Sequence, residues 1–257
     1  MPFSAIPVPV QDILPWRKLY RQEMKCQIVH DSLHAREGWT QSYLLKAAAA
    51  TAGYGVVAVA GPWLGTRTAF EFHVVPEYQL HLFDLFAVFA AAAGVTAFAV
   101  QTNDVLLTLI LHTWCRHATS EKIVFHDKLT TALPANGTIF RRITADDTTQ
   151  IFAHRAEPVG DWMLELDGEI VATGGVLYHY NKPYGDIYLE VAPDFRQRGF
   201  GSYLIQELKR TCYEGGNVPC ARCSPGNFAS RKNFKKAGLA PCAHILTGLM
   251  VPPADYM

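Results

Sequence analysis

The chain has 257 residues, of which 49% are hydrophobic and 18% are charged, so it can bury a sizeable core and is not a disordered chain. Its 23 Lys and Arg residues balance 23 Asp and Glu residues, and this zero net charge lacks the basic excess of non-specific nucleic-acid or membrane binders. We therefore expect no nucleic-acid partner and no membrane association. Any bound phosphate must be held by a local arrangement of groups.

The first ten residues, MPFSAIPVPV, are too short and too interrupted by proline to serve as a secretory signal. Together with six scattered cysteines, this favours a cytoplasmic protein with reduced thiols. Cys220 and Cys223 have the CxxC spacing of zinc and redox sites, but no second pair lies nearby and VPCARCS is typical of a buried strand. We expect no metal.

The polar run 23–32 contains His30 and Asp31, and His34 follows it closely. These residues form no recognisable nucleophile or metal triad. They line a substrate groove or belong to a solvated helix end and loop, and we favour the loop.

The apolar window 85–100 carries no charge and approaches the length of a membrane span. Gly94 interrupts it, so we interpret it as a buried helix followed by a strand. The same patterns predict alternating strands and helices along this half of the chain, at 69–78 (strand), 79–93 (helix), 95–101 (strand), 103–115 (helix) and 122–127 (strand).

The segment 132–138, with Pro134, Asn136 and Gly137, is typical of a linker and divides the chain into two halves. Asp167-Gly168 predicts a hairpin in the second half. The elements that we expect after the linker are a strand at 138–143, a helical stretch near 145–156, two hairpin strands, a strand at 186–191, a helix at 199–216, a strand at 218–224, a helix at 227–238 and a final strand.

The two halves share an order of elements and a short motif. Residues 74–78, VVPEY, match residues 191–195, VAPDF, and the turn QTND before a first-half helix matches SPGN before a second-half helix. We interpret the chain as an old duplication.

The string LEVAPDFRQRGFGSYLIQELK (189–209) carries the most specific chemical signal. A strand leads through a tight turn into a helix that begins with Gly199 and Gly201. Free N–H groups at a helix start form an anion site, and glycines let a diphosphate approach the backbone. A dinucleotide fold is excluded, because Leu204 stands where the third glycine should be and the next strand supplies no ribose-binding acid.

VAPDFRQRGFG resembles the acyl-CoA-binding motif of the GNAT N-acetyltransferases. A second family signature is present in order, as Asn227-Phe-Ala-Ser230, Phe234 and Gly238-Leu239. The resemblance covers residues 138–250. It implies an α+β fold with a mixed sheet, present here as two GNAT-like domains in tandem.

By this resemblance, acetyl-CoA is the co-substrate. The backbone of the first-motif strand should hold its acyl and pantetheine end, the turn and helix start should hold its diphosphate, and the asparagine should contact the pantetheine. The residues implied are Leu189, Glu190, Val191, Arg196, Gln197, Arg198, Gly199, Phe200, Gly201, Ser202 and Asn227.

Overlaying the two prolines puts Leu82 at the place of Gly199 and Asp84 at the place of Gly201. A leucine obstructs close approach and a carboxylate repels a diphosphate. We therefore expect a degenerate domain without a cofactor site at 1–133 and a catalytic domain at 137–257.

Aminolysis of a thioester requires a neutral amine, so a base or a water relay helps the reaction. Glu190 is the carboxylate within the motif strand and is our candidate base, with Asp186, Tyr188 and His179 as alternatives. The alternative is that Glu190 points away and forms a salt bridge with Arg196 or Arg198. Phe234 stands where many relatives carry the tyrosine that protonates the thiolate, and a phenylalanine cannot donate that proton.

We thus expect an acetyl-CoA-dependent N-acetyltransferase that acts by direct attack in a ternary complex. Its acceptor is a primary amine on a small molecule or a peptide, which the sequence does not identify. The alternative is a CoA-binding regulatory module without turnover.

Overall fold

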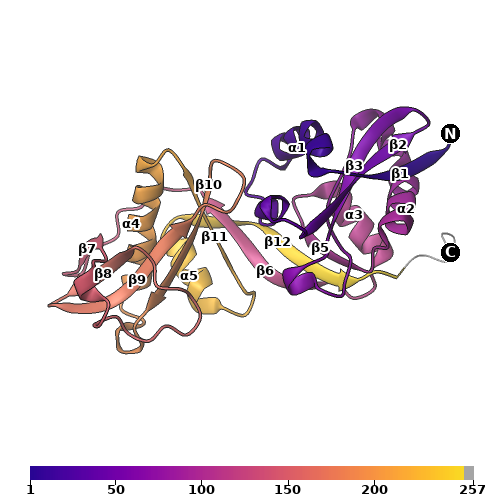
Figure 1. Cartoon of the computed structure of the whole chain (residues 1–257). Helices are drawn as coiled ribbons and strands as arrows, with labels where there is room; N and C mark the ends of the chain where they lie inside the picture. The colour runs from indigo at the N-terminus through magenta and orange to yellow at the C-terminus, as the bar shows by residue number, and fades with distance from the viewer. Residues whose placement is uncertain (252–257) are drawn as a thin grey trace. The chain divides into compact units, whose positions relative to one another are not determined.

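The computed structural model describes residues 1–251, and the chain forms two compact units (Figure 1). The first unit comprises Met1–Lys122 together with the segment that begins at Ala243, and the second comprises Ile123–Cys242. The predicted division at 133 and 137 differs from these bounds, because the strands Thr119–Asp127 (β6) and Leu239–Leu249 (β12) each have residues in both units.

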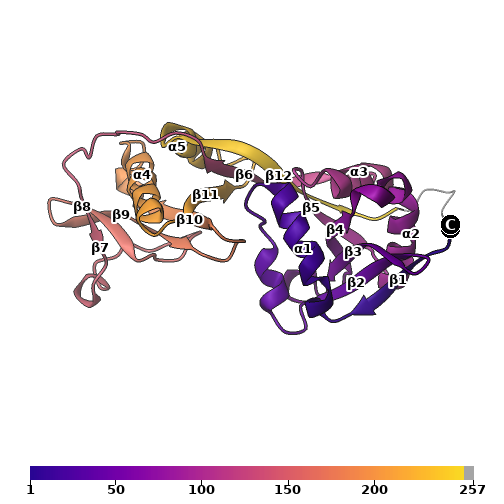
Figure 2. The same ribbon diagram turned by 90° about the horizontal axis from the view of Figure 1, so that it is seen from above.

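The first unit contains a sheet with the strand order β1-β2-β3-β4-β5, followed by the end of β12. Helix α1 packs on one face of this sheet, while α2 and α3 share a second cluster of buried side chains with its other face (Figure 2). The elements are β1 (Phe3–Val8), α1 (Val10–Met24), β2 (Thr40–Ala47), β3 (Ala50–Ala58), β4 (Thr68–Val74), α2 (Leu82–Ala93), β5 (Ala97–Gln101) and α3 (Val105–Trp114), with 3-10 turns at Asp31–Ala35, Gly61–Trp63 and Pro76–His81.

The second unit contains a sheet with the strand order β7-β8-β9-β10-β11-β6. Helix α4 packs against β9, β10 and β11, and α5 packs against α4 and β11. The elements are β6 (Thr119–Asp127), β7 (Ile139–Arg142), β8 (Trp162–Leu166), β9 (Glu169–Leu177), β10 (Tyr184–Val191), α4 (Phe200–Glu214), β11 (Val218–Cys223), α5 (Phe228–Lys236) and β12 (Leu239–Leu249), with 3-10 turns at Ala145–Asp147 and Pro193–Phe195. Parallel and antiparallel pairs occur in both sheets, which confirms the α+β class.

Each unit completes its sheet with a strand that is distant in sequence. In the first unit, residues 245–249 of β12 pair antiparallel with residues 97–101 of β5. In the second unit, residues 123–126 of β6 pair antiparallel with residues 220–223 of β11. Neither half of the chain, cut at the linker, therefore contains all the strands of its own sheet.

The helical stretch expected near 145–156 is wrong for most of its length. Only Ala145–Asp147 form a 3-10 turn, and no helix follows before β8. The Asp147 carboxylate accepts hydrogen bonds from the Thr144 amide and hydroxyl, while it also pairs with Arg141 at 2.7 Å. The turn is therefore held to β7, and the chain continues as the loop that reaches Glu190.

The apolar window 85–100 divides as predicted into α2 and β5, with Gly94 in the left-handed conformation at φ 62°. Among residues 1–251, no helix is long and apolar enough to cross a membrane.

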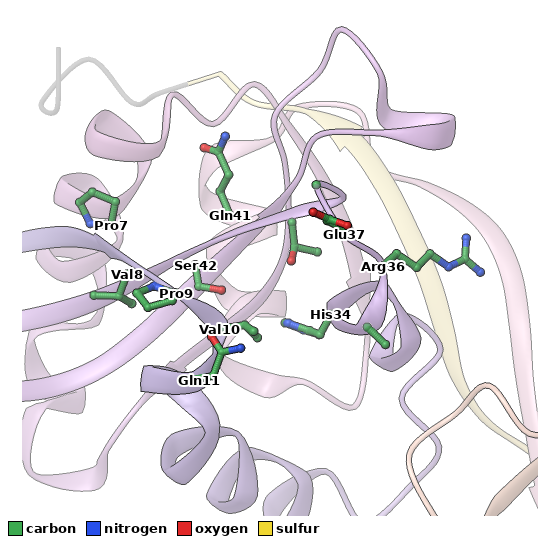
Figure 3. Close-up of a pocket in the computed structure, with 13 residues that line it drawn as sticks. Pro7, Val8, Pro9, Val10, Gln11, His34, Arg36, Glu37, Gln41 and Ser42 are labelled. Carbon is green, nitrogen blue, oxygen red and sulfur yellow. The ribbon is translucent and has the colours of Figure 1, made fainter.

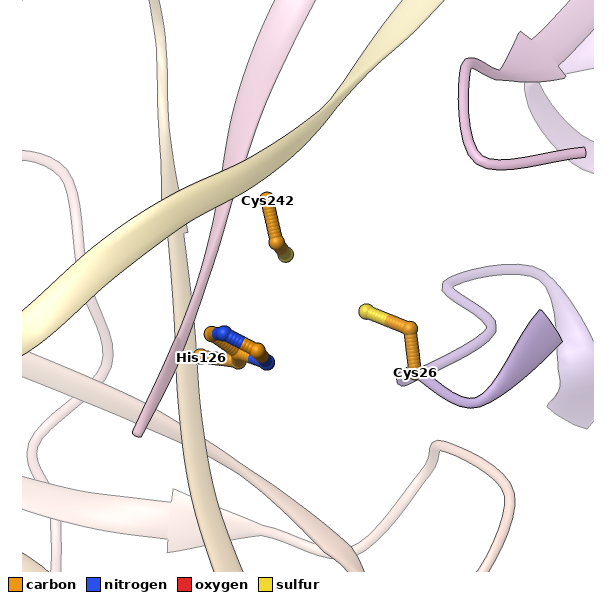
Figure 4. A group of neighbouring side chains, drawn as sticks. All are labelled: Cys26, His126 and Cys242. Carbon is orange, nitrogen blue, oxygen red and sulfur yellow. The ribbon is translucent and has the colours of Figure 1, made fainter. Parts of the chain in front are cut away.

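The cysteines of the CxxC pair lie within strand β11, where Cys220 and Cys223 are both buried. In the second unit, the Cys242 thiol lies 3.4 Å from the Val124 carbonyl oxygen of β6. Figure 4 shows the Cys242 side chain beside His126, and their ligand atoms lie within 4.8 Å of each other. The thiol of Cys242 thus faces the strand that completes the second sheet.

Candidate functional site

The turn between β10 and α4 presents backbone N–H groups. Gln197 and Gly199 both have positive φ values, 63° and 94°, which reverse the chain before the helix starts at Phe200. Gly199 is the N-cap residue and supplies no side chain to the first turn. Because the first four amides of an α-helix have no partner within the helix, this turn is an anion-binding arrangement.

Gly201 lies where α4 approaches α5 closely. A Cβ atom added there would meet the Asn233 side-chain nitrogen at 2.7 Å. The Ser202 hydroxyl donates a hydrogen bond to Asn233 Oδ1 at 3.2 Å. Asn233 thus holds the first turn of α4 in place. The sequence did not indicate this role, because the family signature points to the neighbouring Phe234.

Arg196 and Arg198 are both exposed on the turn. The Arg196 Nε donates to the Val191 carbonyl at 3.2 Å, and the Arg198 guanidinium stacks on Phe195 and Phe200 at 5.1 and 5.3 Å. These contacts hold both cations at the rim of the free-amide turn, where they favour an anion.

Strand β10 separates from β11 part-way along its length but stays paired with β9. The parallel pair is formed by Tyr184, Gly185 and Asp186 with residues 218–220, and in the described chain the pairing ends there. On its other side, β10 remains paired with β9 as far as Val191. The main chain of Leu189, Glu190 and Val191 therefore borders an opening that leads to the free-amide turn.

The Glu190 side chain points toward the loop that precedes β8. Its carboxylate accepts hydrogen bonds from the amides of Arg155, Ala156 and Glu157 at 3.1–3.3 Å, and Arg196 lies 3.8 Å away. Burial opposes ionisation of Glu190, but the three amides and His154 outweigh it and lower its pKa. A carboxylate stabilised in this way is a weak base, so these contacts argue against the predicted role.

Asp186 lies at the point where the two strands begin to separate. It is 5% exposed, with its Oδ2 3.2 Å from His179 Nε2 and 3.3 Å from Arg222 Nε. Burial and the Asp186 charge raise the pKa of the neighbouring Tyr180 well above its usual value. The sequence indicated Asp186 and His179 as alternative bases, and in the structure their side chains lie next to each other. Tyr188, the third alternative, lies further along β10.

Helix α5 contributes its N-cap residue to the same region of the fold. Asn227 is exposed, and its Oδ1 accepts a hydrogen bond from the Ser230 amide at 3.1 Å. Its side-chain NH2 group is not used by the cap. Phe234 is buried, with its ring centroid 5.0 Å from that of Phe125, so it belongs to the core of the unit.

Residues 127–239 match the model of the acetyltransferase (GNAT) family. A comparison with curated proteins finds no match. This segment, which lies mostly in the second unit, is therefore a domain of the GNAT family.

Solved structures similar to this chain cover its whole length. An acetyltransferase of the GNAT family from Colwellia psychrerythraea is 13% identical, with a TM-score of 0.72 over 96% of this chain and 99% of the other. A GCN5-related N-acetyltransferase from Sphaerobacter thermophilus is 15% identical, with a TM-score of 0.62 over 98% and 96%. A tandem GNAT protein from the clavulanic acid biosynthesis pathway is 12% identical, with a TM-score of 0.62 over 99% and 100%. At these identities the likeness concerns the fold alone, and it confirms a fold of two GNAT-like domains in tandem.

The first GNAT unit has a different turn at the corresponding place. Leu82 begins α2 with a buried side chain, and Asp84 lies in the first turn of the helix with its carboxylate 3.7 Å from His81. A carboxylate thus occupies the helix start that would otherwise attract an anion. The difference agrees with the prediction of one cofactor site, which remains a prediction.

The polar run of the first GNAT unit is not simply a solvated loop. The Asp31 carboxylate pairs with Arg17 at 2.7 Å and with Arg21 at 2.8 Å, and His34 Nε2 lies 3.0 Å from the buried Glu71 carboxylate. Burial alone would raise the pKa of Glu71, but Arg17 and His34 lower it well below its usual range. His34 also lines a pocket of about 630 Å³ between β1, β2 and the turn at 31–35 (Figure 3).

Proposed function

We propose that the second unit transfers the acetyl group of acetyl-CoA to a primary amine on a small molecule or peptide, by direct attack in a ternary complex. One observation carries this proposal: the free-amide turn at 197–202 adjoins the one-sided opening between β10 and β11. A diphosphate suits the turn, and an extended amide chain suits an unpaired strand edge. The match of residues 127–239 to the acetyltransferase (GNAT) family supports the same reaction.

The fit of the cofactor can be judged from the backbone. Gly199 has a φ of 94°, which L side chains rarely adopt, and there is no room for a Cβ atom at Gly201 without displacing Asn233. We propose that the amides of Gln197–Ser202 hold the diphosphate and that Arg196 and Arg198 supply compensating charge. The main chain of Leu189–Val191 would hold the pantetheine, with Asn227 donating from its NH2 group.

The amine nitrogen forms a bond to the thioester carbonyl carbon, the carbon–sulfur bond breaks, and the amine proton must leave. We propose that His179, oriented by the Asp186 carboxylate at 3.2 Å, removes this proton directly or through water. Glu190 is less suited, because its oxygens already accept three amide hydrogen bonds. The thiol, with a pKa of about 8.5, leaves as a thiolate without an acid from Phe234.

The test uses the full-length chain with acetyl-CoA and a panel of primary amines, with thiol release as the readout. CoA binding is measured separately by calorimetry. Arg198→Glu should weaken CoA binding roughly tenfold or more, because it reverses the charge beside the diphosphate. Lys18→Glu makes the same charge change on an exposed residue of α1 and should have no effect.

Binding of CoA without thiol release for any amine would favour the regulatory module over the enzyme. Absence of CoA binding would overturn both.

A further inference from the structure

The first unit contains a second cleft, of about 250 Å³, near the C-terminal ends of β4 and β5. Strand β4 pairs with β5 only through Thr68 and Ala69, so these strands separate as β10 and β11 do. The cleft therefore lies at the place in this unit that corresponds to the proposed cofactor opening of the other. Its walls include Tyr20, Glu23 and Met24 from α1, Phe72 and His73 from β4, and Asp104 at the start of α3.

The chain itself occupies part of this opening. Residues 26–29, directly after α1, are all buried. The Gln101 side chain on β5 donates to the Gln27 carbonyl at 2.7 Å and accepts from the Val29 amide at 3.2 Å. The Asn103 side chain donates to the Met24 carbonyl at 3.3 Å. These residues fill part of the opening, and what remains is a small cleft.

Asp104 and Glu23 supply hydrogen-bond acceptors to the cleft. Asp104 Oδ1 accepts from the Leu107 amide at 2.9 Å, and Oδ2 accepts from the Tyr20 hydroxyl at 3.0 Å, which leaves lone pairs on both oxygens. Glu23, at the mouth, has a half-exposed carboxylate. Burial raises the pKa of Asp104 to about 7, so above that pH both side chains are carboxylates and the cleft favours a cation.

His73 supplies a third acceptor. It is 1% exposed, and its Nε2 has no hydrogen-bond partner. Its Nδ1 lies 3.5 Å from the Glu23 carboxylate, which favours a proton on that nitrogen and leaves a lone pair on Nε2. Burial lowers the pKa of the His73 ring. A buried lone pair without a donor is costly, and a ligand N–H group would satisfy it.

No buried cation on α1 neutralises the negative charge of the cleft. Arg17, the closest buried cation on α1, is already paired with Glu71 and Asp31. The ligand atoms of Glu23, His73 and Asp104 do not form a group within 4.8 Å among the described residues, so they are too dispersed for a metal ion. They suit an organic ligand with N–H donors, because such a ligand is large enough to contact several of these separated acceptors at once.

We propose that this cleft binds a small organic ammonium ion. The ammonium lies against Asp104 and Glu23, a donor of the ligand reaches His73 Nε2, and a short apolar chain lies against Met24 and Phe72. The volume admits only a small ligand, since it is at the lower limit of ordinary ligand pockets. The first unit is then a binding unit for a cation, where its counterpart is proposed to bind an anionic cofactor.

The experiment titrates the full-length chain with butylammonium by calorimetry, with butyrate as the probe of opposite charge. We expect binding of butylammonium and none of butyrate. Asp104→Asn, which can keep the helix cap, and Glu23→Gln should each weaken binding roughly tenfold or more. Asp12→Asn removes an exposed carboxylate from the same helix α1 and should leave binding unchanged.

CoA titration of the same variants should be unchanged, and it reports on the second unit independently of the amine result. Equal binding of butyrate, or no binding of butylammonium, would overturn the proposal. So would butylammonium binding that is unaffected by Asp104→Asn and Glu23→Gln, because the amine would then bind elsewhere.

Discussion

Asp104 and Asn227 cap corresponding helices of the two units with the same hydrogen bond. Asp104 Oδ1 accepts from the Leu107 amide at 2.9 Å, and Asn227 Oδ1 accepts from the Ser230 amide at 3.1 Å. The backbone of the cap is therefore alike in the two units. The side-chain atom that the cap does not use differs, because it is a carboxylate oxygen in Asp104 and an NH2 group in Asn227. Asparagine at this cap therefore gives the opening a hydrogen-bond donor for a ligand, whereas aspartate gives it an acceptor.

Asp104→Asn should increase stability at high pH. Burial raises the pKa of Asp104 from 3.8 to about 7, so the folded state binds a proton more tightly than the unfolded state between these values. The protonated carboxyl is accommodated below about pH 4, and stability is lost as the pH rises toward 7. The variant should therefore exceed the natural chain by roughly 1–4 kcal/mol at pH 8 and by much less at pH 4, measured by urea unfolding. A constant difference across this range would contradict the assignment.

Gly201→Asp should abolish CoA binding. The new carboxylate would stand among the free amides of α4, and its Cβ would displace Asn233. Asp84→Ala, at the corresponding position of the first unit, should leave CoA binding unchanged. Calorimetry measures both variants and the number of sites, and a stoichiometry of two CoA per chain would refute the one-site prediction.

A fragment of residues 134–257 should be poorly soluble or bind CoA weakly. It lacks residues 123–126 of β6, including the buried Ile123, Val124 and Phe125, so β11 would present an unpaired edge. It also retains the end of β12, whose partner β5 is missing. Circular dichroism, gel filtration and CoA titration check this prediction, and a stable monomer with full CoA affinity would disprove it.

Glu190→Gln tests whether this residue is the catalytic base or stabilises the loop at 155–157 by accepting its amide hydrogen bonds. Because the pKa of Glu190 is lowered from 4.5, its contribution to stability is present above that pH and is lost as the pH falls through the lower folded value. We expect the variant to lose about 1–3 kcal/mol at neutral pH, with a smaller loss in acid.

The pH profile of kcat/KM for Glu190→Gln should keep the acid limb of the natural enzyme. A base would behave differently: its loss should lower kcat/KM by roughly 10²–10⁴-fold and flatten that limb. His179→Gln is the matched comparison, since it should produce the flattening that Glu190→Gln does not.

Much of the fold was predictable from the sequence because local signals agreed with the final packing. Gly94 ends α2 in the left-handed conformation, and Asp167-Gly168 forms the hairpin turn with φ values of 51° and 83°. The anion-binding turn was likewise visible in the order of its glycines. These features depend on a few adjacent residues, so their sequence is sufficient to indicate them.

The remaining features depend on contacts between distant segments. Glu190 and the amides that bind it are more than 30 residues apart, and no local pattern reports the loop at 155–157. The buried Glu71 joins Arg17, Tyr54 and His34, which come from three other elements. The unit bounds were missed because β6 and β12 each complete a sheet that the other half of the chain begins.

The position of β12 has a consequence for synthesis of the protein. Strand β5 is complete once residue 101 has left the ribosome, but residues 245–249, its antiparallel partner, are translated about 140 residues later. The nascent first unit must therefore keep an open strand edge until those residues emerge. The second unit acquires β6 before any of its other strands. Translation thus imposes opposite schedules on the two units, and a chaperone that shields strand edges would serve the first of them.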